Sequence, residues 1–152
     1  VMMNISSIMA FSQNQQLKIS KDEILIPFGT SVVIKTATED KSLINFKLLD
    51  HSKITEILDY NTAFNNVKLE NFSSEVIVFK FSKFKIFEQE SMALATRSNL
   101  KSDFTFKVKV FYKNKNNKGL DVISADSKNP TIFNTDDIEA ITLYDFEMKK
   151  SN

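Results

Sequence analysis

Alternation of apolar and polar residues is the most regular feature of this chain, and it is clearest over residues 104–112. Successive side chains of a β-strand point to opposite faces, so such alternation predicts a strand with one face in the core and one in solvent. The inward residues of this strand are Phe104, Phe106, Val108, Val110 and Tyr112, and the outward ones are Thr105, Lys107 and Lys109.

The alternation breaks within residues 74–86. Phe79 and Phe81 occupy odd positions, whereas Phe84 and Ile86 occupy even ones. A shift by one residue exchanges the two faces of a strand. The pattern therefore predicts either a β-bulge at residues 82–83 or a bend that carries the strand into a second sheet.

A similar break lies near the C-terminus, in the strand predicted over residues 138–148. Ile141 and Leu143 are offset in parity from Phe146 and Met148. This offset marks a second place where the two faces of a strand exchange.

Residues 52–60 have a different period. Ile54, Ile57 and Leu58 have the i, i+3, i+4 spacing of a single buried helical stripe. Asp50 or Ser52 can cap its start. The spacing predicts one short helix near 52–60.

These segments together give about eight strands separated by polar turns, with one short helix. The predicted fold class is all-β, an antiparallel β-sandwich of the jelly-roll or immunoglobulin-like kind. We assign residues 13–148 to a single β-sandwich domain and residues 149–152 to a tail.

Residues 1–12 form an uncharged, apolar segment that ends in Ala10-Phe11-Ser12, before Gln13. Small residues at these positions suit a signal peptidase, although a basic leading region is missing. Two hypotheses stay open: the end of an export signal, or an N-terminal arm. We expect export to the periplasm, cell surface or extracellular space, and otherwise a place in a virion or cytoplasmic assembly.

The composition excludes much familiar chemistry. The two glycines, Gly29 and Gly119, are not placed to supply G-x-G-x-x-G, Walker A, G-x-S-x-G or EF-hand loops. Zero cysteines exclude disulfides, thiolate metal sites and cysteine nucleophiles. His51 is the single histidine, and the adjacent Asp50 and Ser52 cannot form a Ser-His-Asp triad with it, because adjacent residues do not converge on a shared proton. We expect no enzymatic activity, no catalytic residue, no cofactor and no conventional metal site.

One metal hypothesis stays open, a calcium site within residues 121–139. Calcium takes six to eight oxygen ligands. Acidic residues are also common turn formers where glycine is scarce. The acids concerned are Asp121, Asp126, Asp136, Asp137 and Glu139.

Charge is uneven along the chain, although the net charge is only +1. Residues 76–118 hold ten basic and three acidic residues, a local net charge of +7. Lysines interleaved with aromatic rings can hold phosphates while the rings stack on bases. The same alternation also results when the rings lie in the core and the lysines form a solvated face. Residues predicted to contact a partner or polyanion are Lys107, Lys109, Phe111 and Lys113.

The function predicted from these features is a non-enzymatic binding or structural module. Its expected partners are proteins, bound through sheet faces, the termini or the 113–137 loop. One alternative is a subunit of a larger assembly, such as a virion, tail or fibre component. The other is a nucleic-acid or polyanion binder using the basic 80–118 strands, and nucleic acid ranks below protein. No apolar run is long enough for a transmembrane helix.

Overall fold

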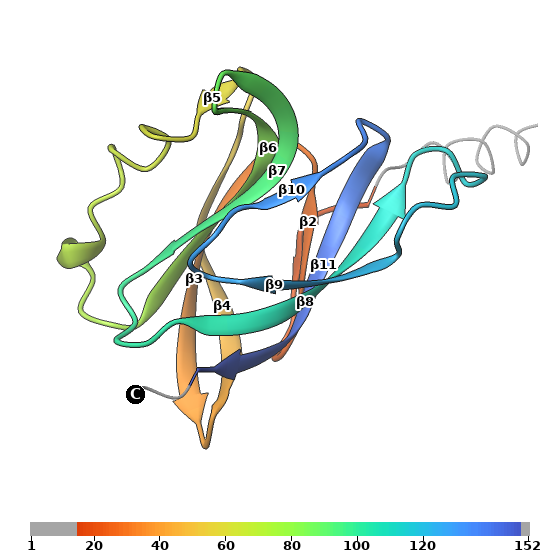
Figure 1. Ribbon diagram of the computed structural model, residues 1–152. Coiled ribbons are helices and arrows are strands. Elements are labelled where there is room, and N and C mark those ends of the chain that lie inside the picture. The colour runs from red at the N-terminus through yellow and green to blue at the C-terminus, as the bar shows by residue number, and fades with distance from the viewer. Residues whose placement is uncertain (1–14, 150–152) are drawn as a thin grey trace, which may run out of the picture.

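The computed structural model describes residues 15–149, and strands dominate this part of the chain (Figure 1). The predicted all-β class is confirmed, with eleven strands rather than about eight, because β1, β5 and β10 are short strands of two or three residues. The elements are β1 (Lys18–Ile19), β2 (Ile24–Pro27), β3 (Thr30–Glu39), β4 (Ser42–Lys53), β5 (Leu58–Asp59), the 3-10 turn η1 (Leu69–Asn71), β6 (Val76–Ile86), β7 (Gln89–Ser98), β8 (Phe104–Tyr112), β9 (Val122–Asp126), β10 (Thr131–Phe133) and β11 (Ile138–Met148).

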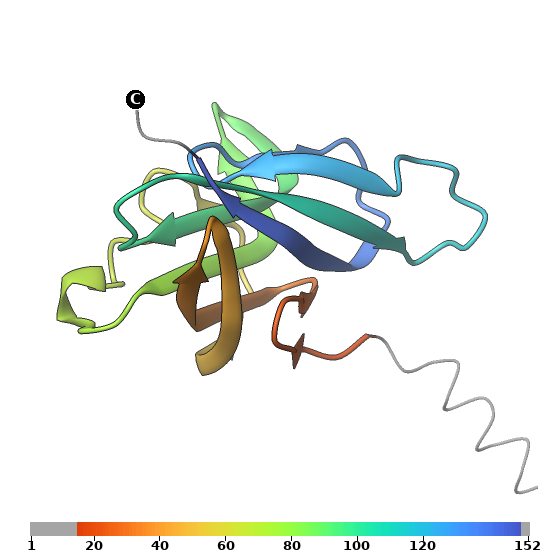
Figure 2. The same ribbon diagram turned by 90° about the horizontal axis from the view of Figure 1, so that it is seen from below.

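The strands form two layers, and Figure 2 shows β8 and β9 of one layer above β3 and β4 of the other. One layer has the order β4-β3-β6-β7-β10, and the other has the order β1-β2-β11-β8-β9. The layers join along one side, where Glu147 of β11 pairs with Ser42 of β4. On the other side the edge strands are β9 and β10, and residues 127–130 connect them.

Phenylalanine rings from both layers fill the space between them. The ring of Phe146 lies 4.9 Å from Phe46, 6.2 Å from Phe79 and 5.2 Å from Phe106, measured between ring centroids. Aromatic pairs at such distances add to the free energy gained from burial alone. This aromatic cluster fixes the two layers against each other.

The strand predicted over 104–112 is β8. Of its predicted inward residues, Phe104, Phe106, Val108 and Val110 are buried, and Tyr112 is partly buried against the core. The parity break in β11 is a bulge. The pairing of β11 with β8 shifts between Tyr144 and Glu147, and Asp145 has a φ of 57°. The extra residue brings Phe146 back to the core face.

The bulge predicted at residues 82–83 is wrong. β6 pairs with β7 without a register shift, from Ile77 opposite Ser98 to Ile86 opposite Gln89. Both faces of β6 are buried instead: Phe79 and Phe81 belong to the main core, and Phe84 and Ile86 to a second cluster. β6 does not cross into the other layer, but its second neighbour changes from β3 to β5 at this point.

The helix predicted near 52–60 is also wrong. Residues up to Lys53 continue β4, and Leu58 and Asp59 form β5, which runs parallel to β6. Of the three residues in the proposed stripe, Ile57 is 47% exposed. Leu58 pairs with Phe84, so backbone groups here form hydrogen bonds with β6 instead of the internal hydrogen bonds of a helix.

The termini differ in how far they are described. The segment 1–12, predicted to be a signal remnant or an arm, lies outside the described residues. Within the predicted tail 149–152, only Lys149 is described, and its amide donates a 2.9 Å hydrogen bond to the carbonyl oxygen of Asp103. Residues 15–149 include no helix long and apolar enough to cross a membrane.

Candidate functional site

The end of the β6–β7 hairpin carries the most exposed large apolar side chain of residues 15–149, Phe87, which is 95% exposed. Ile86 pairs with Gln89, so Phe87 and Glu88 form a two-residue turn. Both have positive φ, 50° and 66°. Such turns favour asparagine and glycine, and a bulky residue at positive φ is strained. The hairpin therefore exposes a large ring at the cost of backbone strain, a combination that points to function.

β5 holds this end of the hairpin in place. The hairpin bends over beside β5 (Figure 1), and Leu58 pairs with Phe84. The amide of Tyr60 donates a 3.1 Å hydrogen bond to the carbonyl oxygen of Lys85. Phe84 and Ile86 are buried next to the turn. The exposed ring thus stands on a packed support.

A cavity of about 570 Å³ opens beside Phe87, between the hairpin end, residues 59–61 and the 128–130 connection. Its wall includes the apolar atoms of Ile86 and the ring of Tyr60. Charges of both signs surround it: Lys85 forms a 3.5 Å ion pair with Glu88. The arrangement offers a projecting ring next to a recess of mixed polarity.

Lys80 lies on the outer face of β6 but is only 8% exposed, because residues 58–67 cover that face. Its Nζ donates a 2.7 Å hydrogen bond to the carbonyl oxygen of Ala63 and lies 5.2 Å from the centroid of the Phe64 ring. Burial lowers the pKa of Lys80, because desolvation penalises the charged form.

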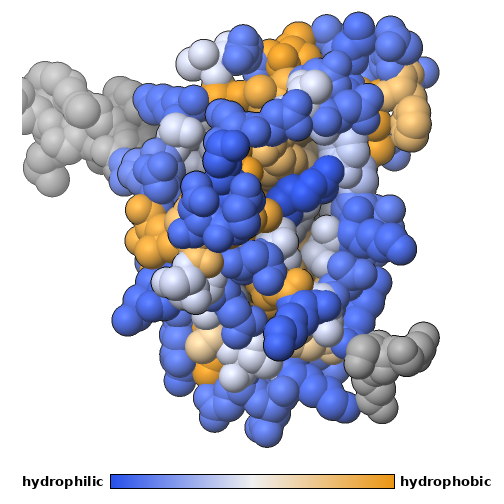
Figure 3. Space-filling model, turned by 90° about the vertical axis from the view of Figure 1, so that its left-hand side faces the viewer, coloured by the Kyte–Doolittle hydropathy of each residue, from blue (hydrophilic) through white to orange (hydrophobic). Residues whose placement is uncertain are grey.

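Arg97, the one arginine of the chain, is on β7 opposite Val78. Its Cζ lies 4.9 Å from the Phe64 ring centroid and 5.5 Å from that of Tyr60. Its Nη1 donates a 2.9 Å hydrogen bond to the carbonyl oxygen of Thr96. Within residues 15–149, neither Arg97 nor Lys80 forms an ion pair with an acid. Figure 3 shows the side of the molecule that carries the segment between β5 and β6, and its surface is mainly hydrophilic with smaller hydrophobic areas.

The predicted contact residues are only partly brought together. Lys107, Lys109 and Phe111 share the outer face of β8, and the Nζ of Lys109 lies 5.5 Å from the Phe111 ring centroid. Phe111 is half-buried. Lys113 lies beyond the end of β8, and its Nζ is 5.9 Å from the ring centroid of Phe28. The four residues therefore belong to two separate groups.

Acidic side chains from neighbouring strands dilute the positive charge of the β8 face. Lys107 forms a 3.3 Å ion pair with Asp145, which the bulge of β11 presents to it. Asp126 of β9 and Glu147 of β11 pair with Thr105 of β8. The local net charge of +7 over residues 76–118 does not include these acids, because they come from other parts of the chain.

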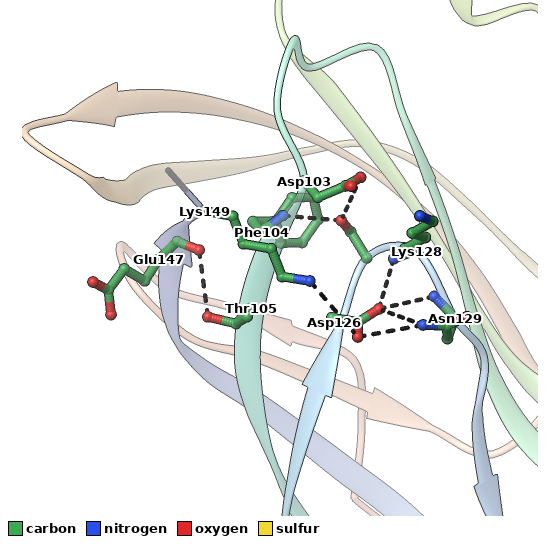
Figure 4. A network of polar contacts seen from close by, with 9 residues as sticks. Asp103, Phe104, Thr105, Asp126, Lys128, Asn129, Glu147 and Lys149 are labelled. Atoms are coloured by element: carbon green, nitrogen blue, oxygen red, sulfur yellow. Dashed lines mark hydrogen bonds and ion pairs between the residues drawn. The ribbon is translucent and has the colours of Figure 1, made fainter. Parts of the chain in front are cut away.

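Two of the five acids of the calcium hypothesis, Asp126 and Asp137, hold two separate turns. Figure 4 shows Asp126 accepting hydrogen bonds from the amides of Lys128 and Asn129, both 2.9 Å long. Burial raises the pKa of Asp126, but these bonds and the charge of Lys149 outweigh it and leave the pKa below its usual range.

Asp137 holds the other turn, accepting hydrogen bonds from the backbone amide of Asn114 and the side-chain amide of Asn117. Among residues 15–149, no group of three or more His, Cys, Asp or Glu side chains is placed to hold a metal ion.

Sequence analysis did not single out Phe87, Lys80 or Arg97 as site residues. A signal for Phe87 existed, since a Phe-Glu pair stands where alternation ends and the next strand begins, without the usual Asn or Gly. No local signal marks Lys80 as buried, because a lysine between strand residues normally faces solvent. Comparisons with protein-family models, with curated proteins and with solved structures found no match.

Proposed function

We propose that the protein is a non-enzymatic binding module that docks onto another protein through the end of the β6–β7 hairpin. The observation that carries this proposal is Phe87, a fully projecting ring at positive φ on a packed hairpin. An aromatic side chain of this kind is the usual anchor of a protein interface, and the adjacent cavity can receive a side chain of the partner in return.

The charges around Phe87 favour a protein over an anionic surface. Lys85 and Lys128 are balanced by Asp59 and Glu88 at the rim of the cavity. An anionic membrane or a nucleic acid would instead select a cluster of basic residues. A rim with both signs of charge suits the polar border of a protein–protein interface.

The experiment uses Phe87→Asn, which removes the ring and introduces a residue that tolerates positive φ. A photo-crosslinking residue at position 87 identifies the partner in extract of the native source. The partner is then purified and titrated against wild type and variant by calorimetry. Loss of an aromatic anchor weakens binding by about 30-fold, equivalent to about 2 kcal/mol.

Leu120→Asn is the matched control, because Leu120 is also a strongly exposed apolar residue, at 74%, but lies in the β8–β9 loop. It is expected to leave the affinity unchanged. Equal affinity of Phe87→Asn and wild type overturns the proposal, and so does the absence of a specific crosslink from position 87.

A subunit of a larger assembly is the second candidate, and the free sheet edges favour it. β9 pairs only with β8, and β10 only with β7. Val122 on β9 is 46% exposed and Ile132 on β10 is 45% exposed. Strand addition at such edges would give self-association in light scattering, and Ile132→Lys would suppress it. A monomeric mass at high concentration would count against self-assembly.

A further inference from the structure

Another, smaller cavity lies beside Arg97 and is lined by residues of the 60–69 segment, and its chemistry differs from that of the recess at Phe87. Its volume is about 270 Å³. Tyr60, Phe64 and Val67 supply apolar walls, while Arg97 and the amides of Asn61 and Asn65 supply polar groups. None of the lining residues is acidic.

We propose that this cavity binds a small organic oxyanion, a carboxylate or phosphate group carried on an apolar body. A guanidinium has five N–H donors in a planar fork that matches such oxyanions. Arg97 uses one hydrogen bond, to the carbonyl oxygen of Thr96, and its Cζ lies over the rings of Tyr60 and Phe64, which restrict where the guanidinium can lie. The remaining donors are available for a ligand.

The asparagines add donors to the same cavity. Within the described part of the chain, the side-chain amides of Asn61 and Asn65 make no hydrogen bond. Amide N–H groups placed next to a guanidinium complete the coordination of a carboxylate or phosphate oxygen.

Charge balance supports the same ligand class. Lys80 and Arg97 approach the one ring of Phe64, at 5.2 and 4.9 Å, and within residues 15–149 no acid pairs with either. Lys80 is buried, so little water screens its charge. Arg97 lines the cavity, and Lys80, which does not line it, lies against the same Phe64 ring, so the positive potential near the cavity favours an anion.

The size and walls of the cavity narrow the ligand further. A volume of 270 Å³ is at the small end for ligand pockets, so it suits a single ring with one acidic group. Tyr60, Phe64 and Val67 provide apolar contact surface for the body of the ligand. The proposal does not depend on Phe87, although Tyr60 and Asn61 also line the larger cavity.

The test titrates isotope-labelled protein with phenyl phosphate, benzoate, inorganic phosphate and benzyl alcohol. Saturable shifts of the Arg97 Nε–H and of the amides of 60–69 are expected with the two aromatic anions. Inorganic phosphate lacks the apolar ring, and benzyl alcohol lacks the anionic group. Each is expected to bind at least about tenfold more weakly than the aromatic anions. The ratio between phenyl phosphate and benzoate decides whether the site prefers phosphate or carboxylate.

Asn65→Asp is the decisive variant, because it places a carboxylate in the cavity with Arg97 and changes little else. It is expected to lower the affinity for the anions by at least about tenfold while the protein stays folded. Asn66, which is exposed like Asn65 but does not line the cavity, provides the control: Asn66→Asp makes the same change of charge and is expected to leave affinity within about twofold.

Equal losses in Asn65→Asp and Asn66→Asp, or no saturable shift with either aromatic anion, overturn the anion site. Phe87→Asn is expected to retain full anion binding, so failure of the docking proposal and failure of the anion site give different results.

Discussion

The Nζ of Lys80 and the carbonyl oxygen of Ala63 are joined by a 2.7 Å hydrogen bond that fastens residues 58–67 onto the outer face of β6. The bond places a lysine in a nearly closed environment. Such a group is stabilised by its hydrogen bond and destabilised by loss of water around its charge. Its contribution to stability therefore depends on pH.

Stability is expected to rise with pH because of Lys80. Its pKa in the folded protein is lowered by desolvation, so the unfolded chain binds the proton more readily. Stability then increases as pH rises through the folded pKa toward the ordinary lysine value of about 10.4. Urea unfolding at about pH 8 and about pH 10 is expected to show a larger gain for wild type than for Lys80→Met.

Lys47→Met, at an exposed position of β4, controls for the loss of one lysine from the chain. It is expected to keep the wild-type dependence on pH. If Lys80→Met keeps that dependence too, the desolvation of Lys80 is not its cause.

The folded conformation of Phe87 predicts an unusual stabilising substitution. Asparagine adopts positive φ more readily than phenylalanine does. Phe87→Asn is expected to raise the free energy of unfolding by about 1 kcal/mol, because it relieves the strain at a φ of 50°. Phe87→Ala removes the same ring, but alanine adopts positive φ less readily than asparagine does, so its free energy of unfolding is expected to rise less. If Phe87→Asn is no more stable than Phe87→Ala, the prediction that positive φ strains the backbone at Phe87 is wrong.

Patterns confined to one strand were predictable from the sequence. The alternation over 104–112 predicted β8 and its buried face, since each inward residue meets the core directly. The parity offset between Leu143 and Phe146 corresponds to the bulge at Asp145. Both features depend on a sheet with one buried face, where period and burial agree.

Patterns that depend on a distant segment were misinterpreted. In β6 the offset between Phe81 and Phe84 arises because residues 58–67 cover the outer face, so both parities are buried. The same covering segment explains the false helix: Leu58 packs on Phe84 and Ile86 from an extended strand. It also buries Lys80 and brings the rings of Tyr60 and Phe64 against Arg97, so the proposed anion site could not be found from local sequence.

Gly119 is expected to be required because of its neighbour Tyr112 rather than because of its own backbone angle. A Cβ at this position would lie 2.5 Å from the Tyr112 Oη and 2.9 Å from its Cζ. Gly119→Ala is therefore expected to displace the phenol from its 2.7 Å hydrogen bond to the carbonyl oxygen of Leu120, with a loss of about 1 kcal/mol or more.

The titration of Tyr112 reports this displacement. Burial and the charges of Asp121 and Asp137 raise the pKa of Tyr112 in the wild type. In Gly119→Ala the pKa is expected to fall toward the ordinary tyrosine value of about 10. Absorbance of tyrosinate during alkaline titration measures it, with Tyr112→Phe identifying the signal of this residue. If Gly119→Ala is destabilised but the pKa of Tyr112 is unchanged, the loop around residue 119 moves and the phenol stays in place.

Asp126 is expected to contribute stability that is lost in acid. Hydrogen bonds from the amides of Lys128 and Asn129 hold its pKa below the usual range despite partial burial. The carboxylate therefore stabilises the fold above the ordinary aspartate value of about 3.9, and the contribution declines as pH falls through the lower folded pKa.

Asp126→Asn keeps an oxygen acceptor but removes the charge, so the variant is expected to be less stable than wild type at neutral pH and to converge with it in acid. Chemical unfolding across the acid range measures the difference, and Asp121→Asn at an exposed loop position is the control. A constant difference between wild type and Asp126→Asn at every pH would show that the carboxylate charge does not hold this turn.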